Sequence, residues 1–172
     1  MKMDIQLERE VLEEIRNYHL PRYSEIPNVG LYLNQVAKFI NEYLAPFCDM
    51  NITESMISNY VKKHLVSNPK KKQYDREQLA YLIFIAFAKS ILSLNNIQAL
   101  LKLQKETYES GVAYEYFCCE FENVLQYVFG LKDNMDDIGN DDSDAKFLFR
   151  NVIITLVHKI YLDHCFRAIE KE

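Results

Sequence analysis

Apolar side chains recur every three or four residues along most of this chain, which is the spacing of one face of an α-helix. The first such segment spans about Asp4 to Tyr18, and Pro21 ends it. A second segment spans Leu31 to Leu44, and Pro46 closes it. The pattern predicts an N-terminal helical arm, residues 1–19, that is joined by an extended, proline-containing connector to the first helix of a larger domain.

This helix and the next one form a helix-turn-helix candidate. Thr53 is a residue type that caps helix N-termini, and it predicts a helix that continues to Lys63. About eight residues separate this helix from the one that ends at Leu44, a spacing compatible with two helices joined by a turn. In DNA-binding proteins of this kind, the second helix lies in the major groove.

A basic loop then precedes a long apolar helix. Residues 70–72 of this loop are lysines, and they stand where a winged helix-turn-helix projects its wing. Asp75 with Gln78 three residues later is a capping-box signature, so a helix begins at this point. Its nearly continuous apolar surface, to Leu92, predicts the central buried helix of the domain, and Ser93 caps a further short helix, Asn95 to Leu103.

The chain changes character after residue 105. Apolar spacing predicts a helix from about Ala113 to Phe129 that stops at Gly130, and a last helix over about Ala145 to Glu170. Between them, residues 132–144 contain six aspartates and two asparagines and predict a solvated linker. We therefore predict an all-α protein with three parts: the arm 1–19, a winged helix-turn-helix domain 20–105, and an acidic C-terminal helical module 106–172.

Composition agrees with an ordinary folded protein. The chain has 172 residues, of which 49% are hydrophobic and 26% charged, and only four Gly and four Pro. Its N-terminal segment has no apolar signal-peptide region, and its longest apolar stretch, Leu79 to Ala88, is half a membrane span. The four cysteines show no secreted disulfide framework. These features predict a reduced, cytoplasmic protein that does not enter a membrane.

Charge is distributed unevenly along the chain. The net charge is −5, yet residues 51–105 alone carry +6, whereas residues 1–50 carry −3 and residues 106–172 carry −8. A basic segment between acidic ones favours an anionic partner for the middle of the chain. The alternative is a charged face that is merely solvated.

Candidate DNA contacts lie on the second predicted helix and on the basic loop. Asn and Ser side chains suit hydrogen bonds to base edges, and Lys ammonium groups neutralise phosphates and release counterions. The candidates are Thr53, Ser55, Ser58, Asn59, Tyr60, Lys62, Lys63, Lys70, Lys71, Lys72 and Gln73. Tyr60 fits a contact with the DNA backbone and a core position equally well.

Three runs in this region resemble the DNA-binding domain of MerR-type transcription regulators. They are ISNYVKKHLVSNP, KKKQYDREQLAYLIFI and SILSLNNIQALL. The resemblance covers about Leu31 to Leu103 and implies a winged helix-turn-helix that binds DNA. The chain departs from that family in having Ser58 where an arginine is usual, Asn59 in place of the first of two tyrosines, and a shortened wing with lysines in place of arginine.

A longer run, LPRYSEIPNVGLYLNQVAKF, is similar to an uncharacterised bacterial family called domain of unknown function 1836. That resemblance implies a helix-turn-helix fold without a specific activity. We predict a non-enzymatic, MerR-like transcription regulator that binds double-stranded DNA as a homodimer, because paired operator half-sites match a protein two-fold axis. The alternative is a non-catalytic protein-interaction module that keeps the fold without binding DNA.

Other candidate chemistry has less support. Adjacent Cys118 and Cys119 point about 100° apart on a helix and cannot chelate a metal as a pair, and His158 and His164 lack the i, i+4 spacing of two ligands. A cysteine–histidine nucleophilic site has no local support. The aromatic candidates for an effector pocket in the C-terminal module, with core or interface positions as the alternative, are Tyr108, Tyr114, Tyr116 and Tyr127. We expect no catalytic residue, metal or cofactor, and a small molecule or a protein as an effector.

Overall fold

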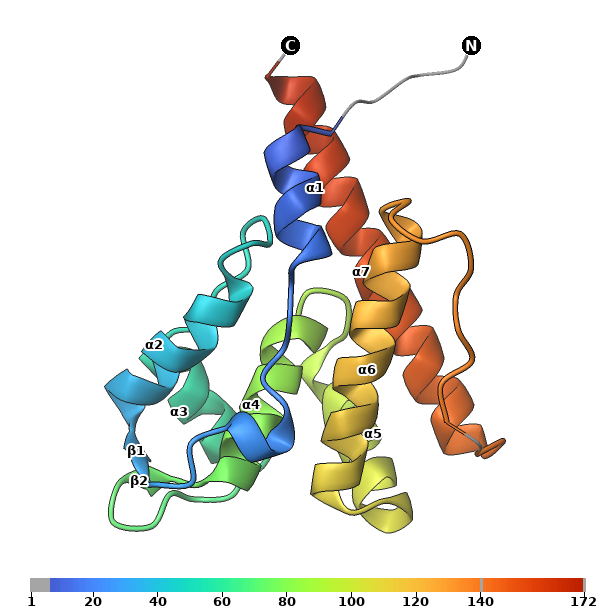
Figure 1. Cartoon of the computed structure of the whole chain (residues 1–172). Coiled ribbons are helices and arrows are strands. Elements are labelled where there is room, and N and C mark those ends of the chain that lie inside the picture. The colour runs from blue at the N-terminus through green and yellow to red at the C-terminus, as the bar shows by residue number, and fades with distance from the viewer. Residues whose placement is uncertain (1–6, 140, 172) are drawn as a thin grey trace.

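Helices dominate the computed structural model, which describes residues 7–139 and 141–171 (Figure 1). The helical elements are α1 (Arg9–Arg16), the 3₁₀ turn η1 (Tyr23–Glu25), α2 (Leu33–Leu44), α3 (Glu54–Lys62), α4 (Arg76–Ala88), α5 (Leu94–Thr107), α6 (Ser110–Val128) and α7 (Asp144–Glu170). Two short strands, β1 (Leu31–Tyr32) and β2 (Gln73–Tyr74), pair antiparallel. The predicted all-α class is confirmed, with this small ribbon in addition.

The helix starts that the capping residues predict are confirmed. Thr53 Oγ1 and Ser93 Oγ each accept the backbone N–H three residues later, both at 3.1 Å. At the start of α4, the side chains of Asp75 and Gln78 accept each other's backbone N–H at 2.9 and 2.8 Å, which is the predicted capping box. Each such cap satisfies N–H groups that the helix itself leaves unpaired and stabilises the helix by about 1 kcal/mol.

Several predicted helix boundaries are wrong by a few residues. The arm helix ends two residues before its predicted end, and positions 4–6 of its predicted start lie outside the described residues. α2 begins two residues late because Tyr32 has an extended backbone in β1 and donates its N–H to Gln35 Oε1 at 2.9 Å. α4 ends at Ala88, before the predicted Leu92, and α5 continues past the predicted Leu103.

One hydrophobic core runs through the protein, with α4 at its centre. α4 packs against α2 on one side and against α6 and α7 on the other (Figure 1). The ring of Phe87 lies 5.0 Å from that of Phe121 on α6 and 5.6 Å from that of Phe47, which follows α2. These rings join the middle of the chain to its C-terminal helices. In the described part of the chain, no helix combines the length and the apolar character that crossing a membrane requires.

The acidic segment between α6 and α7 differs from the predicted solvated linker. Figure 1 shows that the two helices run in the same direction, so this segment returns along the outside of the pair. The Asn123 side chain on α6 donates to the Asp136 carbonyl at 2.8 Å and accepts its N–H at 3.1 Å. Lys146 on α7 donates to the Gly139 carbonyl at 3.1 Å. The segment is therefore mostly exposed, but it is attached to both helices.

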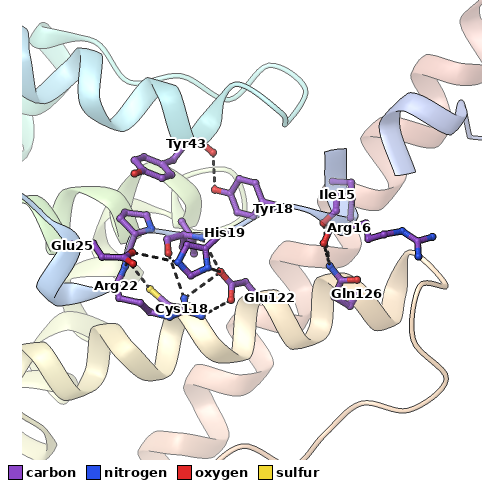
Figure 2. A network of polar contacts seen from close by, with 12 residues as sticks. Ile15, Arg16, Tyr18, His19, Arg22, Glu25, Tyr43, Cys118, Glu122 and Gln126 are labelled. Carbon is purple, nitrogen blue, oxygen red and sulfur yellow. Dashed lines mark hydrogen bonds and ion pairs between the residues drawn. The ribbon is translucent and has the colours of Figure 1, made fainter. Parts of the chain in front are cut away.

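The connector after α1 is held against α6, as Figure 2 shows. The Arg22 guanidinium donates to both carboxylate oxygens of Glu122, at 3.2 and 2.6 Å, and the Leu20 N–H donates to the same carboxylate at 2.8 Å. The Tyr114 hydroxyl donates to the Pro21 carbonyl at 2.7 Å. Polar contacts thus fix the connector on α6.

Candidate nucleic-acid interface

α3 is attached to α2 by the amide of one side chain. Asn41 on α2 donates through Nδ2 to the Ile52 carbonyl and accepts the Ile52 N–H through Oδ1, both at 2.8 Å. Ile52 is buried and directly precedes the cap residue Thr53, so this pair of bonds fixes the start of α3. The Lys89 ammonium at the end of α4 also donates to the Asn51 carbonyl next to it.

The end of α3 is a sharp turn of a kind that glycine usually makes. His64 has a positive φ of 62°, its N–H bonds to the Val61 carbonyl at 3.0 Å, and the Leu65 N–H bonds to the Tyr60 carbonyl at 2.9 Å. These two bonds form a Schellman motif, which satisfies the last helix carbonyls. The chain leaves α3 at this turn and continues into residues 67–74, which we call the basic hairpin.

The tip of the basic hairpin has a strained backbone. Lys70 and Gln73 exchange backbone hydrogen bonds at 3.1 and 2.9 Å, and the two central residues, Lys71 and Lys72, have φ of 49° and 63°. Two positive φ values define a type I′ turn, for which Asn-Gly is the preferred pair. A residue with a side chain pays about 1–2 kcal/mol in this left-handed conformation. Turn geometry therefore does not explain why both central residues are lysines.

The base of the hairpin is fixed to the rest of the protein. The Gln78 side chain donates to the carbonyls of Ser67 and Asn68, at 2.9 and 3.1 Å, and β2 pairs with β1. Gly30 permits a close approach at this point, since a Cβ there would lie 2.6 Å from Gln73 Oε1 and 2.7 Å from Gln73 Cβ. The lysines of the tip thus extend from a fixed base.

Most of the candidate DNA contacts are at the surface. Ser55, Ser58 and Lys62 are three and four residues apart, so they share the outer face of α3, and all three are exposed. Asn59 and Gln73 are half-buried. Also exposed are Lys63, Lys70, Lys71 and Lys72. We call Lys62, Lys63, Lys70, Lys71 and Lys72 the lysine group.

Two of the candidates have a structural function. Thr53 is the N-cap of α3. Tyr60 is only 4% exposed and belongs to the core, where burial raises the pKa of its hydroxyl. Of the two interpretations that the sequence leaves open for Tyr60, the core position is the one found.

The lysine group is not neutralised by the protein itself. Within residues 7–139 and 141–171, no ion pair involves any of its five members. Two of the four other cations of residues 51–105 support the fold instead: Arg76 donates to the Ile26 and Ser24 carbonyls, at 2.9 and 3.3 Å, and Lys89 donates to the Asn51 carbonyl before α3. Of the remaining seven cations of residues 51–105, five form the lysine group, and the other two, Lys102 and Lys105, are exposed on α5.

One pair of reactive residue types comes together that the sequence did not indicate. Cys48 Sγ lies 3.7 Å from His164 Nδ1, and both side chains are buried. Burial raises the pKa of the Cys48 thiol and lowers the pKa of His164, which favours the neutral form of each, whereas a nucleophilic cysteine needs a thiolate. Since 116 positions separate the two residues, no local spacing signals this contact. In the part of the chain that the structure describes, no group of three His, Cys, Asp or Glu side chains is placed to hold a metal ion.

Together, the fold and this surface define a mostly helical protein in which α3 and the basic hairpin carry five lysines without an ion pair among the described residues. The chain belongs to the family described as Domain of unknown function (DUF1836), whose model matches residues 21–117. The matched segment begins in the connector, contains α3 and the basic hairpin, and ends within α6. No curated protein and no solved structure matches the chain.

Proposed function

We propose that this protein is a DNA-binding transcription regulator of MerR-like type, without enzymatic activity. In this proposal α2 and α3 are the helix-turn-helix and the basic hairpin is its wing. The observation that carries the proposal is the lysine group, five exposed lysines on α3 and the hairpin with no acidic partner among the described residues. Duplex DNA is the polyanion that a short exposed helix beside a basic hairpin fits.

The strained hairpin tip supports the same proposal. Lys71 and Lys72 occupy positions where Asn-Gly makes a more stable turn. Residues that break a local structural rule are expected at functional sites. Positive charge at a fixed tip supplies the reason, because each lysine that neutralises a phosphate releases a counterion.

We assign recognition of the DNA base sequence to the outer face of α3. Ser55 and Ser58 are exposed there, and the half-buried Asn59 lies beside them. Hydroxyl and amide groups hydrogen-bond to base edges in the major groove, and Asn pairs best with adenine. The lysine group then provides affinity that does not depend on sequence, and the short polar side chains provide the preference among sequences.

The test is fluorescence anisotropy of the full chain with the duplex upstream of its own gene and with a scrambled duplex, at two salt concentrations. We expect tighter binding to the upstream duplex and weaker binding to both as salt rises. The variant Lys71→Ala/Lys72→Ala should lose about tenfold in affinity for both duplexes. The slope of the logarithm of the binding constant against the logarithm of salt concentration should become shallower by about two.

The matched control removes the same charge elsewhere. Lys102 and Lys105 are exposed on α5, which packs against α6 and α7, so Lys102→Ala/Lys105→Ala should leave binding unchanged. Equal losses in the two double variants would contradict the assignment of the hairpin. No binding of the wild-type protein to either duplex, together with stable co-purification of a protein partner, would instead favour the interaction module.

We further propose that the protein is a homodimer through α7. Leu162, Phe166 and Ile169 are four and three residues apart on this helix and are 49%, 61% and 40% exposed, so they form an apolar stripe on its outer surface. A two-fold axis through such a stripe buries it and presents two α3 helices to paired half-sites.

Light scattering at micromolar concentration should give a dimer, and Phe166→Glu should give a monomer. Val29→Glu, which changes an exposed apolar residue outside the stripe, should remain dimeric, and a monomeric wild-type protein would exclude the proposal.

A further inference from the structure

A partly enclosed apolar cavity of about 240 Å³ lies where α4, α5, α6 and α7 meet. Its walls include Phe84 of α4, Leu101 of α5, Phe117 of α6, and Phe149 and Ile153 of α7. Almost all of this surface is carbon. The cavity lies on the opposite side of α4 from α2, which holds α3.

Three of the four tyrosines proposed for an effector pocket contribute to this cavity. Tyr108, Tyr114 and Tyr116 line it, whereas Tyr127 lies on the outside of α6 and is 43% exposed. The hydroxyls of Tyr108 and Tyr114 are engaged, with Ser143 Oγ and the Pro21 carbonyl respectively, each at 2.7 Å. The Tyr116 hydroxyl is buried and has no hydrogen-bond partner among the described residues. A buried polar group of this kind is unfavourable unless a partner satisfies it.

A chain of hydrogen bonds forms one rim of the cavity. Ser110 Oγ donates to Glu77 at 2.6 Å and lies 2.7 Å from the Tyr81 hydroxyl. The same hydroxyl donates to Gln104 Oε1 at 2.9 Å, and Gln104 donates to the Tyr108 carbonyl at 2.8 Å. These bonds connect α4, α5 and the start of α6, and the Tyr108 hydroxyl extends them to Asp141 of the acidic segment. The opening is therefore held in shape by polar contacts while the interior stays apolar.

The volume limits what the cavity can hold. An engineered apolar cavity of about 150 Å³ binds benzene, and pockets for drug-sized ligands start at about 300 Å³. A space between these sizes suits one or two fused rings. Aromatic walls favour an aromatic occupant, because rings pack edge-to-face or offset against one another.

Charge further restricts the occupant. Glu120 lies one helical turn from Tyr116 and its carboxylate is buried, while Asp141 stands at the rim. Lys146, the one cationic side chain of the lining, is already bound to the Gly139 carbonyl and lies 3.8 Å from Asp137. An anionic ligand would thus lose its hydration next to carboxylates without gaining a free cation.

We propose that this cavity is a binding site for a small, uncharged aromatic compound of one or two rings. The site does not depend on the proposed DNA binding, since none of the lysine group lines it. A ligand there contacts α4 and α5 of the middle segment together with α6 and α7.

The experiment is isothermal titration calorimetry of the full chain with indole, 4-methylphenol, toluene and benzoate. We expect one saturable site for the first three probes, with dissociation constants on the order of 0.1–1 mM, and at least tenfold weaker binding of benzoate. Absence of saturable binding for every neutral probe would overturn the proposal, as would equal binding of benzoate.

A filled cavity provides the second test. Ala113 lines the site, so Ala113→Leu should abolish binding of indole, whereas Ala99→Leu, the same change at an exposed position of α5, should retain it. A measurement on the wild-type protein covers the case in which Ala113→Leu does not fold. Methyl resonances of Leu101 and Ile153 should shift on addition of indole, and those of the distant Val29 should not. Shifts spread evenly over all methyl groups would count against a defined site.

Discussion

The region after residue 105 and the surface formed by α3 and the basic hairpin carry similar numbers of basic side chains, six and five. The two regions differ in whether these side chains form ion pairs. After residue 105, every Lys and Arg in the described part of the chain forms an ion pair with an acidic side chain. They are Lys132, Lys146, Arg150, Lys159, Arg167 and Lys171. The five members of the lysine group form none within the same residues.

This difference shows that the overall acidity of the chain says little about its partner. The excess negative charge belongs to the C-terminal region, where it is partly compensated inside the fold, whereas residues 51–105 have only three acidic side chains. The members of the lysine group repel one another and form no ion pair among the described residues, so their clustering does not stabilise the fold and supports the proposed anionic partner. Mutations can therefore separate charges that stabilise the fold from charges that bind a partner.

The largest effect on stability is expected from a carboxylate of the C-terminal region. Glu122→Ala removes the partner of Arg22, which is half-buried, and the acceptor of the N–H of Leu20, which is buried. Unfolding in urea should show a loss of about 3 kcal/mol, because the remaining groups lose their partners in a partly buried site. Glu106→Ala, at an exposed position of α5 without an ion pair among the described residues, should stay within about 0.5 kcal/mol of the wild type. Equal losses in the two variants would show that the ion pair of Glu122 with Arg22 does not stabilise the fold.

The next largest effect concerns the position of α3, which depends on a neutral contact. Asn41→Ala leaves the N–H and the carbonyl of the buried Ile52 without their partners and should reduce the free energy of unfolding by about 2 kcal/mol. DNA binding should weaken as well, since the start of α3 loses its attachment to α2. Asn34→Ala, at an exposed position of the same helix, is the control and should change neither property. Full stability of Asn41→Ala would mean that packing alone holds the turn.

Local signals in the sequence were sufficient for most of the fold. Capping residues located the starts of α3, α4 and α5, and Gly130, with a φ of 72°, ends α6 as its residue type predicts. The sequence does not predict strand β1, because a strand of two residues shows no detectable alternation of apolar and polar positions. Leu31 and Tyr32 therefore fit the helical spacing of the residues after them.

The site was predictable only as far as its residues are neighbours in sequence. Lysine enrichment of residues 62–72 is visible directly, but the absence of acidic partners around it depends on where the distant acidic segments fold. The same applies to the contact of Cys48 with His164 and to the cavity, whose walls come from four helices. Tyr60 remained ambiguous because a tyrosine has both an apolar ring and a polar hydroxyl, and only burial decides between the two.

A smaller change in stability, in this case an increase, is expected at the hairpin tip. Lys71→Asn/Lys72→Gly supplies the pair that a type I′ turn prefers, so the free energy of unfolding should rise by about 1 kcal/mol. Lys71→Ala/Lys72→Ala removes the same charges but retains the strain, and its stability should not rise. Both variants should lose DNA affinity to the same extent, since both lose the two proposed phosphate contacts. Anisotropy together with thermal unfolding separates strain from charge, and retained affinity in the Asn-Gly variant would show that the lysines are not the contacts.

The smallest expected effect is on the pH dependence of stability, through the buried carboxylate of Glu120. Arg150 Nε lies 3.3 Å from Glu120 Oε1, yet neither oxygen of this buried carboxylate has a hydrogen bond within the described residues. Burial raises the pKa of Glu120 above its ordinary value of 4.5, and this effect is larger than the opposing attraction of Arg150. The folded state then binds the proton more tightly than the unfolded state does, so ionisation of Glu120 reduces stability as pH rises from 4.5 through the raised pKa.

Glu120→Gln removes this titration, and the variant should gain stability relative to the wild type as pH rises across that window, then keep a constant difference. Urea midpoints measured from pH 4.5 to 7 test this, with Glu106→Gln as the control, for which we expect no change in the difference. A difference that shrinks with rising pH would mean that pairing with Arg150 outweighs burial. In that case Glu120 would belong with the stabilising carboxylates such as Glu122, and ion pairing would account for the cations of the C-terminal region without exception.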